Sequence, residues 1–426
     1  MRVGIIGAGI SGLSAALALR QAGHEVDVFQ REDEAGGLLA TFDFDGVPVE
    51  HFYHFLCRTD IGFFRFCQQL EISPFLRFDE VSTGFYYNGA PFRFCKPLDL
   101  LLFPGFPLAD RLRLGKFAID IRKRQDWEAL DRIPAKQWLI DRLGETVYRV
   151  VWEPLLALKF GDYHDRISAA WIAHRVHRVA RSRNQMGYLE GGTRRLLDTL
   201  VARLEAEGVR LHTGRPVKRI LAEGDRVSGL AFDGHPDHAC DRVISTVPLP
   251  VLAGLLPAGW EEYAAALSRI DYIGVVCVAL KLRRPVSRHF WYNVHDPRIP
   301  FNGIIEYTNL NPMPGLGGHL VYVPYYAATD RPIYSLPDAE AVAQSWAALK
   351  RMNPALEDGD LLDSHVARTP YAQAICPAGF QDMLPDQIAP LKGLRLLDST
   401  FLYPEDRTQS GHIVKALACA ADIEAE

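Results

Sequence analysis

Long apolar runs are missing from this 426-residue chain, and none reaches the length that crosses a bilayer. No basic leader or cleavage site precedes the first predicted strand, so we expect neither a transmembrane segment nor a secretory signal. An excess of positive charge is missing too: the formal net charge is −5, whereas binding a nucleic-acid backbone needs a basic face. The sequence therefore predicts a cytoplasmic protein without a nucleic-acid partner.

A regular cysteine pattern is also missing. The seven cysteines are scattered along the chain, and no Cys-x-x-Cys occurs. An odd, scattered set is typical of reduced thiols, several of them packed as small core residues. The sequence therefore predicts no disulfide framework and no metal site.

The chain does have an ordinary globular balance, with 48% hydrophobic and 23% charged residues, at a length that favours two domains. An α/β pattern opens the chain, returns near residue 188 and reappears at the end, while aromatic and helical stretches lie between. We therefore predict an interleaved α/β fold. One domain is expected to comprise residues 1–55, 186–262 and 388–426. An inserted α+β substrate domain is expected to comprise residues 56–185 and 263–387.

The most specific motif lies in the first thirty residues. Residues 3–6 are predicted as a strand, 14–22 as a helix and 25–29 as a second strand, and the first turn is Gly7-Ala8-Gly9-Ile10-Ser11-Gly12. In this context Gly7 makes the tight turn, Gly9 lets the backbone approach a pyrophosphate, and Gly12 lets helix and strand pack closely. The helix N-terminus then offers N–H groups and a partial positive charge to the phosphates. The sequence predicts a Rossmann-like dinucleotide-binding unit.

A second glycine pair, Gly36-Gly37, precedes Leu38 shortly after the second strand. With a glycine pair at this distance from the first glycine motif, the chain resembles the flavoprotein superfamily of amine oxidases, protoporphyrinogen oxidases, carotene desaturases and UDP-galactopyranose mutases. In that superfamily the pair packs on the pyrophosphate and ribityl chain of FAD. The resemblance implies noncovalently bound FAD, since no cysteine or histidine lies in a pattern typical of a covalent flavin link.

The end of the second strand departs from the usual motif, which has an acidic residue there for the ribose hydroxyls. Gln30 follows the strand instead, and its amide oxygen could accept a hydrogen bond without charge. We predict that Gln30 contacts the adenosine ribose as a neutral partner. Arg31 is expected to face solvent, because FAD has no 2′-phosphate for an arginine to bind.

The resemblance extends along most of the chain. Residues 188–193 and 244–248 look like the family's return to the FAD domain and its Ile-Ser-Thr-Val-Pro strand exit. By the same resemblance, the backbone at Val217 meets the adenine and Asp398 binds the ribityl hydroxyls. The helix that opens near His412 and Ile413 is expected to face the pyrimidine end of the flavin.

One feature of amine oxidases is absent. Their lysine on a long substrate-domain strand, aimed at flavin N5, is replaced by Cys277 when that strand is placed on residues 270–282. Paired aromatics that would cage an amine are not evident near residues 408–410. We therefore predict no oxidation of simple amines.

Three residues are candidates for catalysis. The pair His51 and His54 looks like the His-x-x-His segment that lies against the flavin in UDP-galactopyranose mutases, and histidine can bond or protonate near neutral pH. The alternative is two structural imidazoles among packed aromatics. Arg407 belongs to a charged loop, residues 403–407, that faces the flavin in relatives.

A basic amphipathic helix is predicted over residues 109–124. Such a helix could touch a membrane surface, although a solvated helix face explains the pattern as well. Peripheral membrane contact therefore stays open alongside the simpler interpretation.

The resemblance implies an FAD-dependent oxidoreductase that moves a hydride from a bulky organic substrate to flavin N5. The first alternative is a non-redox sugar-nucleotide mutase, for which arginines would bind the diphosphate. The second is a non-catalytic binding protein on the same fold. The substrate is expected to be a small molecule, lipophilic or a sugar nucleotide. The candidate arginines of the mutase are Arg175, Arg178, Arg181 and Arg183.

Overall fold

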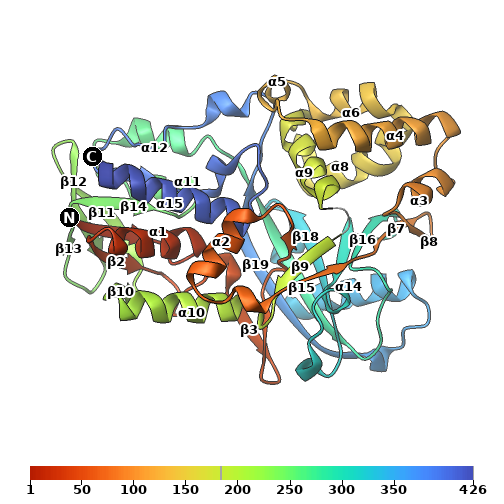
Figure 1. Ribbon diagram of the computed structural model, residues 1–426, viewed down its shortest axis with the longest axis horizontal. Helices are drawn as coiled ribbons and strands as arrows, with labels where there is room; N and C mark the ends of the chain where they lie inside the picture. The colour runs from red at the N-terminus through yellow and green to blue at the C-terminus, as the bar shows by residue number, and fades with distance from the viewer. Residues whose placement is uncertain (183–184, 426) are drawn as a thin grey trace.

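The computed structural model describes residues 1–182 and 185–425, and Arg183 lies outside this range. A five-stranded parallel sheet forms one half of the molecule (Figure 1). Its strands are, in spatial order, β10 (Arg210–His212), β2 (Glu25–Phe29), β1 (Arg2–Ile6), β14 (Arg242–Ser245) and β20 (Leu394–Leu396). The chain enters this sheet from three distant segments, residues 2–29, 210–245 and 394–396.

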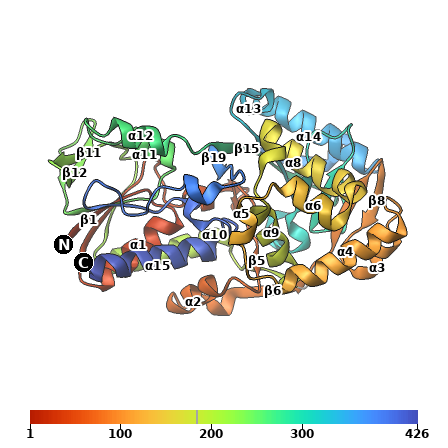
Figure 2. The ribbon, with the colours of Figure 1, turned by 90° about the horizontal axis from the view of Figure 1, so that it is seen from above.

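Both faces of the parallel sheet are covered, as a parallel sheet requires. On one face β1 packs Val3 and Ile5 against α1 (Ile10–Gln21), α10 (Gly192–Ala206) and α15 (Gln409–Ala425). Ile6 belongs to the core on the other face, beside a three-stranded sheet of β11 (Val217–Glu223), β12 (Arg226–Phe232) and β13 (His238–Ala239). Both termini lie at the far end of this half (Figures 1 and 2).

A mixed seven-stranded sheet organises the other half. Its spatial order is β19 (Leu361–Ala374), β15 (Tyr272–Leu282), β18 (His319–Ala327), β17 (Gly303–Glu306), β16 (Trp291–His295), β7 (Thr83–Tyr87) and β8 (Ala90–Arg93). Helix α14 (Asp338–Met352) packs on it. A group of helices stands beyond the sheet in Figure 1: α4 (Leu108–Asp120), α6 (Ala135–Leu143), α8 (Glu153–Phe160) and α9 (Ala169–Arg181).

Shorter elements connect these layers. One is a two-stranded sheet of β3 (Thr41–Phe44) and β4 (Val47–Glu50). Another is a three-stranded sheet in which β9 (Gln185–Leu189) lies between β5 (Leu56–Cys57) and β6 (Leu76–Glu80). The remaining α-helices are α2 (Ile61–Gln69), α3 (Pro97–Leu102), α5 (Glu128–Asp131), α7 (Glu145–Val147), α11 (Leu249–Ala253), α12 (Glu261–Leu267) and α13 (Pro332–Ser335).

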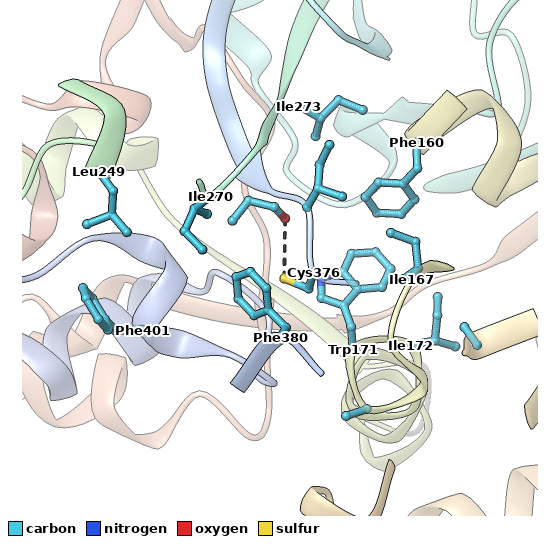
Figure 3. Packing of buried hydrophobic residues seen from close by; sticks show 14 of the residues in the cluster. Phe160, Ile167, Trp171, Ile172, Leu249, Ile270, Ile273, Cys376, Phe380 and Phe401 are labelled. Carbon is cyan, nitrogen blue, oxygen red and sulfur yellow. Dashed lines mark hydrogen bonds between the residues drawn. The ribbon is translucent and has the colours of Figure 1, made fainter. Parts of the chain in front are cut away.

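The largest hydrophobic core joins the two halves. Figure 3 shows Ile270, which precedes the long strand β15, and Ile273, near its start, beside Cys376, which follows the end of the neighbouring strand β19. Phe380 and Trp171 pack around them from opposite sides. The two halves are therefore held together by continuous apolar packing where the chain crosses between them.

Two predicted helices differ in extent from the structure. Helix α1 begins at Ile10 rather than at residue 14, because the glycine turn leads directly into the helix and Gly12 is already helical. The basic helix ends at Asp120, and a 3₁₀ turn continues it through Ile121–Lys123. Over residues 1–182 and 185–425, no helix combines the length and apolar character needed to span a membrane.

Candidate functional site

A cavity of about 2050 Å³ runs from the glycine turn of the first half into the second half. Its size exceeds the roughly 300–1,000 Å³ of an ordinary ligand pocket. At one end it is lined by Gly7, Gly9, Gln30 and Val217, and at the other by side chains of α8, α9, β18 and β19. The cavity therefore has a turn-lined end and a side-chain-lined end, and room for more than one small ligand.

Packing of the protein itself explains two glycines of the turn. Gly7 has φ +102°, and a Cβ there would lie 2.5 Å from Oγ1 of Thr246. A Cβ on Gly12 would lie 2.0 Å from the carbonyl oxygen of Gly7. A side chain at Gly7 would clash with the residue that follows β14, and one at Gly12 would clash with the turn between β1 and α1, so these glycines are required by the fold.

Gly9 is different, because the protein leaves the space beside it open. A Cβ on Gly9 would meet only the carbonyl oxygen of Gly36, at 4.0 Å. Gly9 is also the N-cap of α1, and no side chain caps the helix there. The first N–H groups of α1 and their positive end of the helix dipole therefore face a cradle that a phosphate fits.

The second glycine pair packs against this turn. The amide of Gly36 donates to the carbonyl of Ala8 at 2.8 Å, and a Cβ on Gly37 would come within 3.4 Å of the Gly9 Cα. Both glycines have positive φ, at +134° and +56°. Leu38 follows, is 39% exposed and lines the cavity. The pair thus forms a second wall of the same cradle.

The contact of Gln30 with the adenosine ribose stays a prediction, and the protein itself already bonds this side chain. The amide oxygen of Gln30 accepts from the Ala8 N–H at 2.8 Å, and its side-chain N–H donates to Glu32. Gln30 is therefore engaged on both sides in holding the turn. Glu32 lines the cavity two residues after Gln30. Arg31 pairs with Glu32 and is largely exposed, as expected.

At the middle of the cavity, Asp398 is buried and caps a 3₁₀ turn. Its Oδ1 accepts from the Thr400 amide at 2.7 Å, the Thr400 hydroxyl at 2.6 Å and the Tyr272 hydroxyl at 2.8 Å. Burial raises the pKa of this carboxyl, although these bonds oppose the shift. Tyr272 was not predicted from the sequence as part of the site.

Two predicted residues on α15 separate in the structure. His412 lines the cavity and shares a 2.8 Å hydrogen bond between its Nδ1 and the Ser11 hydroxyl. Burial, and then the charge of Arg407, lower the pKa of His412 to about 4. Ile413 instead points into the helix-covered core and is fully buried, because adjacent helical residues face different sides.

The two histidines of the His-x-x-His segment also differ. Both line the cavity, but Nδ1 of His51 lies 2.9 Å from Nε2 of His365, so that ring is held by β19. Nδ1 of His54 is buried, and no partner reaches it within the described residues. Burial, and then Arg407, lower the pKa of His54 to about 4, so it is neutral at physiological pH. Of the two, His54 is the one left to bond a ligand.

A chain of paired charges forms one side of the other cavity end. Arg178 donates to Asp60 through Nε at 3.4 Å and Nη2 at 2.8 Å. Arg175 donates to Asp406 at 2.8 Å, and Nη1 of Arg178 lies 3.9 Å from the same carboxylate. Burial raises the pKa of Asp406, but the stronger combined effect of Arg175 and the neighbouring cations brings it far below its usual value. Asp406 is therefore a carboxylate at any physiological pH.

Aromatic rings hold two further cations in this end. Nζ of Lys159 lies 4.3 Å from the centre of the Tyr326 ring and 5.1 Å from that of Trp171. Arg407 donates to the Tyr326 hydroxyl at 3.2 Å, and the Tyr53 hydroxyl lies 3.2 Å from the same oxygen. Lys159 was missed from the sequence, although a lone lysine in the apolar run of residues 155–160 was the available signal.

Two sequence expectations concern groups that the cavity lacks. Cys277 lies on β15, is 1% exposed and lines the cavity. It is the residue that the sequence comparison places at the position of the amine-oxidase lysine. Across residues 1–182 and 185–425, no three or more histidine, cysteine or acidic side chains gather as a metal site would require. Of the arginines suggested for a diphosphate, Arg175 and Arg178 line the cavity and Arg181 does not.

Comparison with known proteins gives a consistent result. The family described as flavin containing amine oxidoreductase matches residues 10–396. The zeta-carotene desaturase of Synechocystis sp. is 26% identical over 315 residues, which cover 66% of this chain and 64% of that enzyme. The alignment thus spans just under two thirds of this relative.

Solved structures share the fold. A structure from Exiguobacterium sp. 255-15, provisionally assigned as a protoporphyrinogen oxidase, has a TM-score of 0.78 at 18% identity and covers 100% of this chain and 98% of that one. Reduced UDP-galactopyranose mutase has a TM-score of 0.76 at 15% identity, with 99% and 95% covered. Since the family match extends over most of the residues, the chain belongs to the flavin containing amine oxidoreductases.

Proposed function

We propose that the chain binds FAD noncovalently along the cavity and uses it to oxidise a bulky organic substrate. The pyrophosphate lies over Gly9 and the N-terminus of α1, where the protein leaves a cradle that no side chain of its own fills. This open position is the observation that carries the proposal, because Gly7 and Gly12 are explained by packing and Gly9 is not. The ligand supplies the missing reason for a glycine there.

The remaining contacts follow from the order of residues along the cavity. The adenosine lies between Val217 and Glu32, and the ribityl hydroxyls bond Asp398, whose Oδ1 is already fixed by three donors. The isoalloxazine lies near His54 and His412. On this assignment the Rossmann-like FAD domain comprises residues 1–55, 186–262 and 388–426, and residues 56–185 and 263–387 form the inserted substrate domain.

The flavin supplies a hydride acceptor for a substrate carbon, and the chain positions the two partners. The neutral imidazole of His54 is able to donate or accept one hydrogen bond at the reaction end without adding charge. The largely apolar walls contributed by Leu155, Leu156 and Ile172 exclude water from the substrate. Similarity to a carotene desaturase supports a large substrate with an extended apolar part.

The test starts with the purified protein. We expect a yellow protein whose FAD is released by denaturation, as a noncovalent ligand is, and whose absorbance bleaches when an oxidisable substrate is added without oxygen. A colourless protein that takes up no FAD on reconstitution would refute the proposal.

A sugar-nucleotide mutase is the second candidate, supported by the fold likeness and by Arg175 and Arg178 in the cavity. Both arginines, however, are already bonded to carboxylates, which weakens them as diphosphate ligands. Interconversion of UDP-sugars by the reduced protein, without net oxidation, would favour this candidate over the first.

A further inference from the structure

The reaction end of the cavity holds more positive charge than its own carboxylates balance. Asp60, Arg178, Asp406 and Arg175 form a linked set of two acids and two bases. Each carboxylate of this set is already bonded to an arginine. Within the set the charges cancel, so any additional cation at this end needs a partner from elsewhere.

Two such cations are present, Lys159 and Arg407. Both line the cavity, and neither forms an ion pair with a carboxylate of the described residues. The contacts of Lys159 are the faces of aromatic rings, and Arg407 donates to the Tyr326 hydroxyl and faces that ring at 5.8 Å. Tyr326 thus lies between the two cations and holds both near the same part of the cavity.

Ring contacts and a neutral hydroxyl are weak compensation for buried charge. A cation–π contact returns only part of what an unpaired buried charge costs. Burial lowers the pKa of Lys159 well below its usual value, and Arg175 and Arg407 lower it further, although Asp406 opposes the shift, so the charged form of Lys159 is disfavoured as long as no anion is bound. The site is therefore electrostatically incomplete until an anion enters it.

The same geometry argues against an amine ligand. The aromatic faces of Phe160, Trp171 and Tyr326, which could have caged a substrate ammonium, already hold the ammonium of Lys159. Arg175 covers the Trp171 ring as well, with its Cζ 3.4 Å from the ring centre. A second ammonium would have to displace or oppose these cations.

We propose that Lys159 and Arg407 bind an oxyanion of the substrate, so that the enzyme acts on a bulky apolar molecule bearing a carboxylate or a phosphate. This assignment rests on the proposed flavin-dependent oxidation, and it names the chemical class of that substrate. Arg407 is well suited to a planar or phosphate oxyanion because its guanidinium presents several donors in a fixed fork. The apolar walls of the cavity receive the rest of the molecule.

Calorimetric titration of the flavin-bound protein tests this directly. The probes share one ten-carbon chain and differ in the head group: decanoate, decyl phosphate, decanol and decylamine. We expect either oxyanion to bind at least about tenfold more tightly than decanol, and decylamine to bind more weakly than decanol. A preference for decanoate or for decyl phosphate assigns the source of the oxyanion, and either preference supports the site.

The variants Lys159→Gln and Arg407→Gln should each weaken binding of the preferred oxyanion about tenfold or more, while decanol affinity stays within twofold. Lys116→Gln is the matched control, because Lys116 also lines the cavity but is exposed and paired with Asp120. It should leave all four affinities unchanged. The flavin spectrum and melting temperature of each variant establish that it is folded and loaded.

Two results would overturn the proposal: decylamine binding as tightly as decanoate, or equal losses of oxyanion and decanol affinity in both variants. Failure of the proposed function looks different, since the purified protein would then hold no flavin at all. A flavin-loaded protein without head-group selectivity refutes the oxyanion site alone.

Discussion

The two ends of the cavity differ in what lines them, mainly backbone at one end and side chains at the other. At the nucleotide end the walls are mainly backbone: the turn at Gly7–Gly12, the pair Gly36–Gly37 and the first N–H groups of α1, all within forty residues of one another. At the reaction end the walls are side chains, among them Lys159, Arg175 and Arg407, from α8, α9 and the loop before α15. The first end depends on local conformation, and the second on long-range assembly.

This difference has a physical consequence. A backbone-lined site tolerates little change in residue size but is nearly indifferent to pH, because N–H groups do not titrate. A site lined by buried charges tolerates changes in size better but depends on every partner, since removing one leaves another uncompensated. Substitutions at the two ends should therefore fail in different ways.

The largest expected effect is at Gly9. Gly9→Val should lower FAD affinity by at least roughly 100-fold, because the side chain enters the phosphate cradle, while the fold is retained because the protein leaves that space open. Gly12→Val should instead destabilise the protein itself, since its Cβ would overlap the Gly7 carbonyl. Flavin content and melting temperature, measured together, separate the two. Equal behaviour of both variants would remove the distinction between a ligand-required and a fold-required glycine.

At the charged end, Asp406→Asn should destabilise the protein by roughly 2 kcal/mol at pH 7, somewhat less than the ~3–5 kcal/mol for a fully buried pair. The folded-state pKa of Asp406 lies below its unfolded value, so its contribution is present above about pH 4 and is lost as the pH falls from there. Denaturant unfolding at pH 7 and at pH 3 should show the difference shrinking.

The control for that prediction is Asp382→Asn. Asp382 pairs with Arg132 on the surface, where both side chains are more than half exposed, so the loss should stay under about 1 kcal/mol. If both substitutions cost the same, the buried network contributes nothing special and the contrast between the two ends is wrong.

His54→Ala tests whether the reaction end acts through hydrogen bonding. We expect FAD to remain bound and its anaerobic reduction to slow about tenfold, the loss of roughly one hydrogen bond. Stopped-flow absorbance measures the rate. His319→Ala, which changes a histidine outside the cavity lining, is the control. An unchanged rate in His54→Ala would make that imidazole structural.

The smallest effect on stability is expected at Asp398, midway between the two ends. Burial raises the pKa of its carboxyl, so relative to an amide its contribution to stability decreases as the pH rises above about 3.8, the unfolded value. Asp398→Asn in the flavin-free protein should therefore be as stable as wild type at pH 7, or up to about 1 kcal/mol more stable, and relatively less favoured at pH 3. A marked loss at pH 7 would mean that the carboxylate itself stabilises the fold.

Local pattern was sufficient for the second strand. It has the predicted bounds, Glu25–Phe29, because its apolar residues recur at strand spacing in the sequence itself. The resemblance carried by the glycine motifs likewise led to the family that the comparisons identify. The cofactor contacts assigned to individual residues stay predictions.

Other parts of the site could not be predicted from the sequence. Gln30 follows the second strand as predicted, yet its hydrogen bonds to Ala8 and Glu32 depend on how the turn folds back. His51 and His54 look equivalent in the sequence, and only the position of His365, more than 300 residues later, distinguishes them. The sequence assigns no role to Lys159, because its contacts with the rings of Tyr326 and Trp171 depend on the tertiary structure.

The sequence by itself therefore determined the βαβ opening and the family, because glycine conformation and strand–helix alternation act over a few residues. The tertiary structure alone decided which cations remain without carboxylate partners among the described residues and which of the two imidazoles is held by another side chain. Charge compensation is a property of distances across the fold. Lys159 and Arg407 are almost 250 positions apart in the sequence. They meet only because the fold brings both of them to the ring of Tyr326 on β18.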